Sequence, residues 1–160
     1  MSDFSILPFY HSSLQTANKR VAADILKCNK KTREHGLILS EEQALRLAET
    51  RAESLKDSGR IEFGSKSTSD LISAFSDSPY IIQENYEQTL HELIRIFYDF
   101  KNETSELLSD RQLINFMKKY FDSTCAGSTE LLETRELTQL AMHLNNGGRL
   151  SSFKPDTEEM

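Results

Sequence analysis

Three polar residues, His91, Arg95 and Asp99, recur every four positions in a stretch that also carries Glu92 and Tyr98. Residues four apart lie on one face of an α-helix. An imidazole and carboxylates on one face could join an acid–base site or hold a metal ion. Ion pairs along a solvated helix explain the same residues, and we favour that interpretation. His91, Arg95, Tyr98 and Asp99 are therefore the candidate face for a ligand or partner, and no residue is assigned as catalytic.

A loop between two predicted helices resembles the calcium-binding loop of an EF-hand. Asp122 stands at its first position, Gly127 at its sixth and Glu133 at its twelfth. The third and fifth positions, which normally supply oxygen ligands, hold Thr124 and Ala126. Because calcium needs six or more oxygens, the sequence favours an ordinary helix–turn–helix here. We expect no metal site and no cofactor.

The two cysteines, Cys28 and Cys125, give neither a disulfide framework nor zinc spacing. Cys125 precedes a predicted helix start, where the helix dipole can lower the pKa of a thiol. A nucleophilic cysteine also needs a base, and the nearest histidine, His143, lies at the far end of the following helix. We therefore expect a packed loop cysteine, and two free thiols favour a cytoplasmic protein.

Motifs of the common enzyme classes are missing from the sequence: it has no glycine-rich phosphate loop, no G-x-S-x-G turn and no dinucleotide fingerprint. The net charge of -6 argues against a nucleic-acid partner. No apolar run has the length of a membrane-spanning helix, so no membrane partner is expected. A protein partner, or a second copy in a homodimer, remains.

The aliphatic composition predicts which elements carry these residues. The chain has 160 residues, with 20 Leu and 10 Ile but one Val, a balance that favours helices over an extensive sheet. We expect a mainly α, single-domain bundle of five to six helices over residues 1–148, and a polar, disordered tail over 149–160. At most one short β pair is expected, near 37–39 and 60–63, where residues 60–63 alternate polar and apolar.

Apolar periodicity places the helices at about 12–33, 40–58, 70–76, 81–102, 109–121 and 128–146. A serine at position 12 or 13 caps the first helix, and capping boxes, Ser40 with Gln43 and Ser109 with Gln112, begin two others. The helix over 81–102 has a wide apolar arc, which is typical of a central bundle helix.

Three stretches of the sequence resemble an uncharacterised family of small bacterial proteins, a domain of unknown function of about this length. They are residues 59–64 (GRIEFG), residues 75–80 (FSDSPY), and residues 96–103 (IFYDFKNE) together with 108–110 and 121–122. The resemblance covers mainly residues 37–135. It implies a bacterial cytoplasmic protein and supplies no activity, ligand or catalytic residue.

Two function classes follow from these observations. The favoured one is a non-enzymatic helical interaction module, because every polar residue named above has a structural explanation. The alternative is a small-ligand-binding or enzyme domain with a site between helices around His91, Arg95 and Asp99.

Overall fold

The fold is mainly α, as the composition predicts. The structure is a computed structural model that describes the backbone of residues 3–155 and the side chains from Leu14 onward. Helices make up 71% of it, and no strand occurs in residues 3–155. None of the helices in that range is long and apolar enough to cross a bilayer. The helices of eight residues or more are α1 (Asp3–Lys27), α3 (Glu41–Ser58), α4 (Lys66–Ala74), α5 (Tyr86–Glu103), α6 (Asp110–Phe121) and α8 (Thr138–Asn145).

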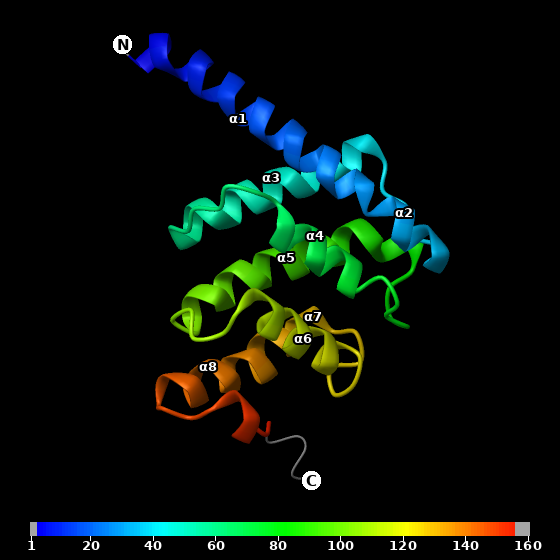
Figure 1. Cartoon of the computed structure of the whole chain (residues 1–160), viewed down its shortest axis with the longest axis vertical. Helices are drawn as coiled ribbons and strands as arrows, with labels where there is room; N and C mark the ends of the chain where they lie inside the picture. The colour runs from blue at the N-terminus through cyan, green and yellow to red at the C-terminus, as the bar shows by residue number, and fades with distance from the viewer. Residues whose placement is uncertain (1–2, 156–160) are drawn as a thin grey trace.

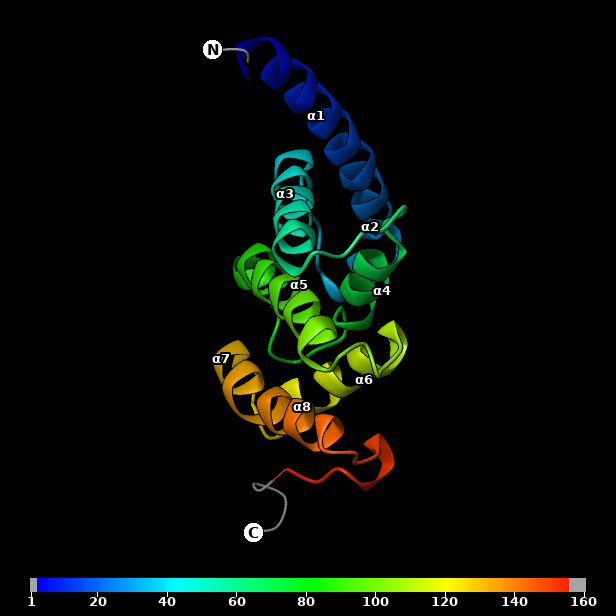
Figure 2. The same cartoon turned by 90° about the vertical axis from the view of Figure 1, so that its left-hand side faces the viewer.

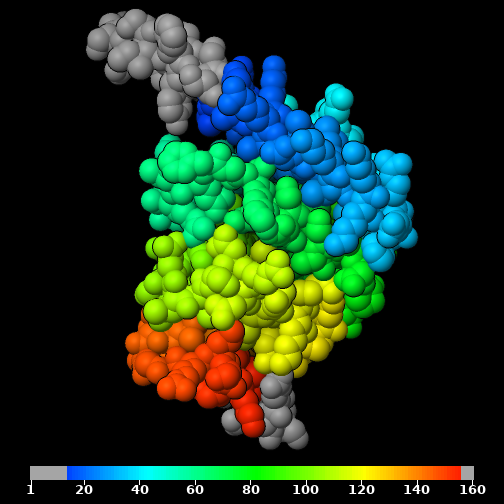
Figure 3. Space-filling view, in the orientation of Figure 1, coloured from blue at the N-terminus to red at the C-terminus, as the bar shows by residue number. Residues whose placement is uncertain are grey.

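The helices are stacked along the long axis of the molecule in nearly the order of the chain (Figure 1). α1 packs on α3, α3 packs on α5, and α5 contacts α6. α4 fills the space beside α5 and also touches α1 and α6. The view turned by 90° shows the same order (Figure 2), and a space-filling view shows it as successive bands of colour (Figure 3).

α5 is the central helix of this stack, as its wide apolar arc predicts. Its buried residues come from more than one side of the helix, which leaves only a narrow exposed face. They are Tyr86, Leu90, Leu93, Ile94, Ile96, Phe97, Tyr98, Phe100 and Lys101. The neighbouring helices α3 and α6 each begin with the predicted capping box, in which a serine and a glutamine satisfy free backbone N–H groups.

The first helix differs from its prediction at both ends. α1 begins at Asp3, whereas the sequence placed a serine cap at position 12 or 13, and it ends at Lys27. A short helix, α2 (Asn29–Thr32), and a tight turn continue to Gly36. At the break the N–H of Cys28 bonds to the carbonyl of Ile25, one residue closer than in an α-helix.

The two segments proposed as a short β pair do not pair with each other. Residues 37–39 are held instead by two side-chain amides. Asn29 exchanges two hydrogen bonds of 2.9 Å with the backbone of Leu39, and Gln83 exchanges two of 2.8 Å with the backbone of Ile38. The amides thus take the place of a neighbouring strand, which the alternating pattern alone could not reveal.

The C-terminal segment differs in part from the expected polar tail. Leu150–Ser152 form one helical turn, and the ring of Phe153 lies 5.4 Å from that of Phe116. His143 bonds to the carbonyl of Arg149 at 2.8 Å. Residues 149–155 therefore lie against the bundle. Residues 156–160, which complete the predicted tail, lie outside the described part of the chain.

Candidate functional site

Arg95, on the predicted face of α5, is held by three carboxylates. It donates two hydrogen bonds to Glu133, of 2.9 and 3.1 Å, and one each to Glu92 and Asp99 at 3.1 Å. The hydrogen bonds that Arg95 donates to Glu133 raise the pKa of the guanidinium above its usual value. Arg95 therefore ties α5 to the helix that follows Ser128, and its hydrogen-bonding capacity is largely used in that tie.

The other predicted face residues do not converge with Arg95. Nδ1 of His91 lies 2.7 Å from the hydroxyl of Thr50, in a shallow cleft between α3 and α5. Tyr98 is buried on another side of α5. Asp99 borders a different, acidic cleft, where burial raises the pKa of its carboxyl against the opposing charge of Arg95. Of the four, only Arg95 and Asp99 are joined.

The EF-hand-like loop forms the helix–turn–helix that the sequence favours. Asp122 pairs with Lys118 at 2.5 Å and accepts a hydrogen bond from Ser78, while Glu133 pairs with Arg95. The first and last positions of the loop are therefore committed to different neighbours. Among the described residues, no group of three His, Cys, Asp or Glu side chains is placed to hold a metal ion.

Cys125 is a buried thiol, as expected for a packed loop cysteine. Its sulfur lies 3.2 Å from Oε2 of Glu136, whose carboxylate also accepts hydrogen bonds from Thr124 and Arg135. Burial and the neighbouring Glu136 raise the pKa of the Cys125 thiol to about 12. The helix dipole that the sequence suggested is thus outweighed, and the thiolate is disfavoured.

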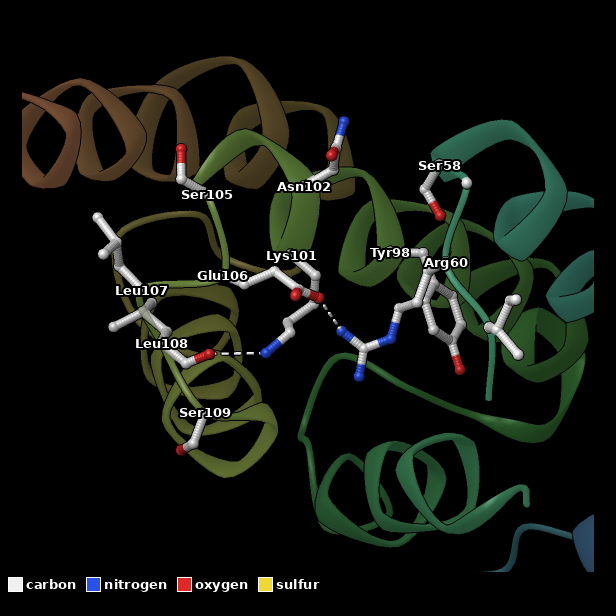
Figure 4. Close-up of a pocket in the computed structure, with 12 residues that line it drawn as sticks. Ser58, Arg60, Tyr98, Lys101, Asn102, Ser105, Glu106, Leu107, Leu108 and Ser109 are labelled. Carbon is white, nitrogen blue, oxygen red and sulfur yellow. Dashed lines mark hydrogen bonds and ion pairs between the residues drawn. The ribbon is translucent and has the colours of Figure 1, made fainter. Parts of the chain in front are cut away.

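A cleft of about 970 Å³ opens between two loops that approach each other over α5 (Figure 4). One loop, residues 58–61, follows α3, and the other, residues 105–109, joins α5 to α6. Tyr98, Lys101 and Asn102 of α5 line the cleft between them. Both loops come from sequence regions that carried no predicted site residue.

Six charged side chains meet beside this cleft, and we call them the charged cluster. They carry three positive and three negative charges from five separate segments of the chain, so their formal charges cancel. The members are Arg51, Arg60, Glu62, Lys101, Glu106 and Asp110.

Arg60 is the centre of the charged cluster because each of its three guanidinium nitrogens meets a different carboxylate. Nε lies 3.0 Å from Glu62, Nη1 lies 2.5 Å from Glu106, and Nη2 lies 3.3 Å from Asp110. Lys101 also pairs with Asp110, at 3.0 Å. These contacts fix the orientation of the guanidinium, with Nη1 directed toward Glu106 across the cleft (Figure 4).

Asp110 is a carboxylate whose ionised form the charged cluster stabilises. Burial disfavours the charged carboxylate. Hydrogen bonds from Ser67 and Lys101, and the charges of Lys101 and Arg60, nevertheless hold the pKa of Asp110 below its usual value. Its position in the first turn of α6 favours a negative charge as well.

Glu62 anchors the inner side of the cluster, where only 9% of its side chain is exposed. It accepts a 2.6 Å hydrogen bond from the hydroxyl of Tyr98 and pairs with Arg51 and Arg60. Arg51 donates a further 2.6 Å bond to the carbonyl of Gly64. Burial and the contact with Glu62 raise the pKa of Tyr98.

In the segment from Arg60 to Phe63 the usual burial pattern is reversed: the charged side chains are buried and the apolar side chains are exposed. Its charged residues, Arg60 and Glu62, point into the charged cluster, whereas Ile61 is 80% exposed and Phe63 is fully exposed. Leu107, on the opposite loop, is 58% exposed. Alternating side chains of an extended chain point to opposite sides, so burial of the charges drives the apolar residues outward.

The opposite loop holds Ser105 and Glu106 in the left-handed backbone region, with φ of 54° and 56°. Residues other than glycine adopt this region at an energetic cost, and such strain is concentrated at functional sites. The N–H groups of Ser105 and Glu106 donate hydrogen bonds to the carbonyls of Asn102 and Lys101, and these bonds hold the turn in this conformation. The turn places the carboxylate of Glu106 on Arg60.

Comparison with known proteins assigns the chain to a family. A protein-family model, described as a family of unknown function (DUF6323), matches residues 24–150. The chain belongs to this family. The resemblance drawn from the sequence is confirmed, and the match extends beyond residues 37–135 at both ends. Neither the curated proteins nor the solved structures gave a match.

The family region contains the whole charged cluster and both loops of the cleft. Of the predicted site residues, Tyr98 lines this cleft. Sequence reasoning does not find the charged cluster, because its charges lie far apart along the chain and each alone reads as a solvated side chain. The alternation of residues 60–63 is a further signal, but it does not indicate that the polar side faces inward.

Proposed function

We propose that this protein is a helical interaction module that binds an extended segment of a partner protein along Arg60–Phe63, at the edge of the cleft. The inverted burial of this segment is the observation that carries the proposal. Exposed apolar side chains that gather on one surface often mark a site of interaction with another protein. Ile61 and Leu107 are exposed and line one polar cleft, and Phe63, two residues after Ile61, is fully exposed.

The backbone of the same segment supports this mode of binding. Within the described part of the chain, the N–H and C=O groups of Ile61, Glu62 and Phe63 form no hydrogen bonds. A partner strand laid alongside would satisfy these groups and cover the outward apolar side chains at the same time. Main-chain bonds would supply affinity, and the side chains around the cleft would supply specificity.

The alternative, a small-ligand or enzyme site around His91, Arg95 and Asp99, has less support. His91 and Asp99 border different clefts, and Arg95 is occupied by three carboxylates. A bacterial cytoplasmic location is part of the proposal. It rests on the family resemblance and on the two free, buried cysteines, which suit a reducing compartment.

Selection from a phage-displayed library of random twelve-residue peptides on the immobilised chain tests the proposal. We expect enriched peptides with apolar residues at alternate positions. Their binding should weaken at least tenfold on the double variant Ile61→Ser/Phe63→Ser. The matched control is Met142→Ser, which removes a 62% exposed apolar side chain from α8 and should leave binding unchanged.

Two results would overturn the proposal: no enrichment above that on the double variant, or selected peptides that bind both chains equally. Light scattering of the free chain distinguishes a second copy as the occupant. If the free chain is a dimer and Ile61→Ser/Phe63→Ser dissociates it, the partner at this surface is a second copy of the chain and not a different protein.

A further inference from the structure

We propose that Glu106 occupies, in the free protein, the place of a carboxylate from the bound segment. The cleft then recognises an aspartate or glutamate side chain of its partner through Arg60. This inference rests on the proposed function and names the chemistry of the segment that the cleft selects.

The three carboxylates around Arg60 differ in how firmly they are held. Glu62 is almost completely buried, and Asp110 is half-buried and also bonded by Lys101 and Ser67. Glu106, in contrast, is 61% exposed, and Arg60 provides its one ion pair among the described contacts. Glu106 is therefore the carboxylate that a ligand can exchange, while the other two keep the guanidinium in position.

The exchange is favourable because of solvent exposure. Water screens the ion pair between Arg60 and the exposed Glu106. A bound segment would cover the cleft and shield its own carboxylate from water, which strengthens the same charge-assisted hydrogen bond. Lys101 lines the same cleft, and two of its three ammonium protons are accounted for, by the carbonyl of Leu108 and by Asp110.

The residues beside the Arg60–Glu106 pair define the sequence that fits. Ile61 follows Arg60 on one loop, and Leu107 follows Glu106 on the other. Both side chains are exposed and line the cleft. A segment that places an acidic residue on Arg60 would therefore set apolar residues against Ile61 and Leu107. The occupant is an extended, acidic and apolar peptide.

The left-handed turn at Ser105 and Glu106 is consistent with a Glu106 carboxylate that pairs with Arg60 until a ligand replaces it. Backbone strain at these two residues serves no packing purpose for Glu106, whose side chain is mostly in solvent. It does present the carboxylate to Arg60. The free cleft thus keeps Arg60 paired, and a segment without an acidic residue would leave the pair between Arg60 and Glu106 in place.

The test uses the peptides selected on the wild-type chain from the random twelve-residue library. We expect an acidic residue at a fixed position between apolar ones. The strongest binder is then synthesised with and without replacement of that residue by its amide, and dissociation constants are measured by fluorescence anisotropy. The amide peptide should bind the wild-type chain at least tenfold more weakly.

The chain variant Glu106→Gln gives a readout that misfolding cannot imitate, because we expect it to bind the acidic peptide more tightly. It should bind the acidic peptide about three- to tenfold more tightly than the wild-type chain and leave the binding of the amide peptide unchanged. Arg60→Lys keeps the charge but loses the planar fork, so it should remove most of the preference for the acidic peptide.

The outcomes separate this inference from the proposed function. Absence of any peptide that depends on Ile61 and Phe63 would remove both. Peptides that depend on Ile61 and Phe63, show no acidic preference and bind Glu106→Gln no more tightly would overturn the role of Glu106 and leave the interaction module standing.

Discussion

At the scale of single residues, Glu62 links the two arginines of the charged cluster. Its buried carboxylate faces two guanidinium groups, those of Arg51 and Arg60, and accepts the hydroxyl of Tyr98. Buried charges are tolerated only when paired and hydrogen-bonded. Removal of this one charge would leave both arginines near each other without their shared counter-ion.

We therefore expect Glu62→Gln to lower the free energy of unfolding by roughly 3–5 kcal/mol, since it breaks a buried ion pair from one side. Urea denaturation followed by circular dichroism measures the change. The matched control is Glu106→Gln, which removes a charge from the same cluster at an exposed position. That variant should cost at most about 1 kcal/mol.

If Glu62→Gln and Glu106→Gln lowered the free energy of unfolding equally, burial would not determine how much each carboxylate of the charged cluster stabilises the fold. The comparison also bears on the cleft, because a small effect of Glu106→Gln on stability is what allows its effect on binding to be read without correction for unfolding.

At the scale of elements, the turn between α6 and α7 (Thr129–Leu131) depends on the absence of a side chain at Gly127. Gly127 has φ of 82°, and a Cβ added there would lie 2.5 Å from Cβ of Tyr80. Gly36 ends the turn after α2 with a similar φ of 77°, but a Cβ added there meets nothing within 4 Å. The two glycines share the backbone requirement and differ only in packing.

The pair of substitutions to alanine separates these two contributions. Gly36→Ala should destabilise the chain by about 1–2 kcal/mol through the left-handed backbone alone. Gly127→Ala should add a packing penalty of about 1–3 kcal/mol, because Tyr80 must move from its edge contact with Phe121. Thermal unfolding of both variants checks the difference, and similar melting temperatures would contradict it.

The elements were predictable from sequence where one face is apolar at helical spacing. α3, α5 and α6 were predicted with their serine caps or apolar arcs, because both signals are local. Residues 37–39 and 60–63 could not be assigned in this way. Their partners, the amides of Asn29 and Gln83 and the charged cluster, come from other elements, and contacts of that kind leave no local pattern.

The candidate site was hidden for the same physical reason. The i, i+4 spacing of His91, Arg95 and Asp99 was visible, and it corresponds largely to ion pairs along and beside α5. The charges that meet beside the cleft come from α3, α5, α6 and two loops, and no spacing rule connects them. The sequence does show that polar and apolar residues alternate at 60–63. Only the tertiary structure decides which of the two sets faces inward.

At the scale of the whole molecule, the stacked order of the helices leaves α8 at the C-terminal end of the stack (Figure 1). α8 closes the stack with little beyond it, and Leu150 and Phe153 pack against its core from residues first expected to form a tail. The rings of Phe116, Tyr120 and His143 surround Phe153 within 6.5 Å. This contact therefore extends the folded unit past residue 148.

Phe153→Ala tests whether the segment stabilises the fold. The side chain is half-buried, so we expect a loss of about 1–2 kcal/mol, less than the 3–5 kcal/mol of a fully buried phenylalanine. Lys154→Ala, at the exposed neighbouring position, should change stability by less than about 0.5 kcal/mol. Urea midpoints at constant slope measure both. If Phe153→Ala matched Lys154→Ala, the boundary at residue 148 would stand and the segment would be a dispensable appendage of the bundle.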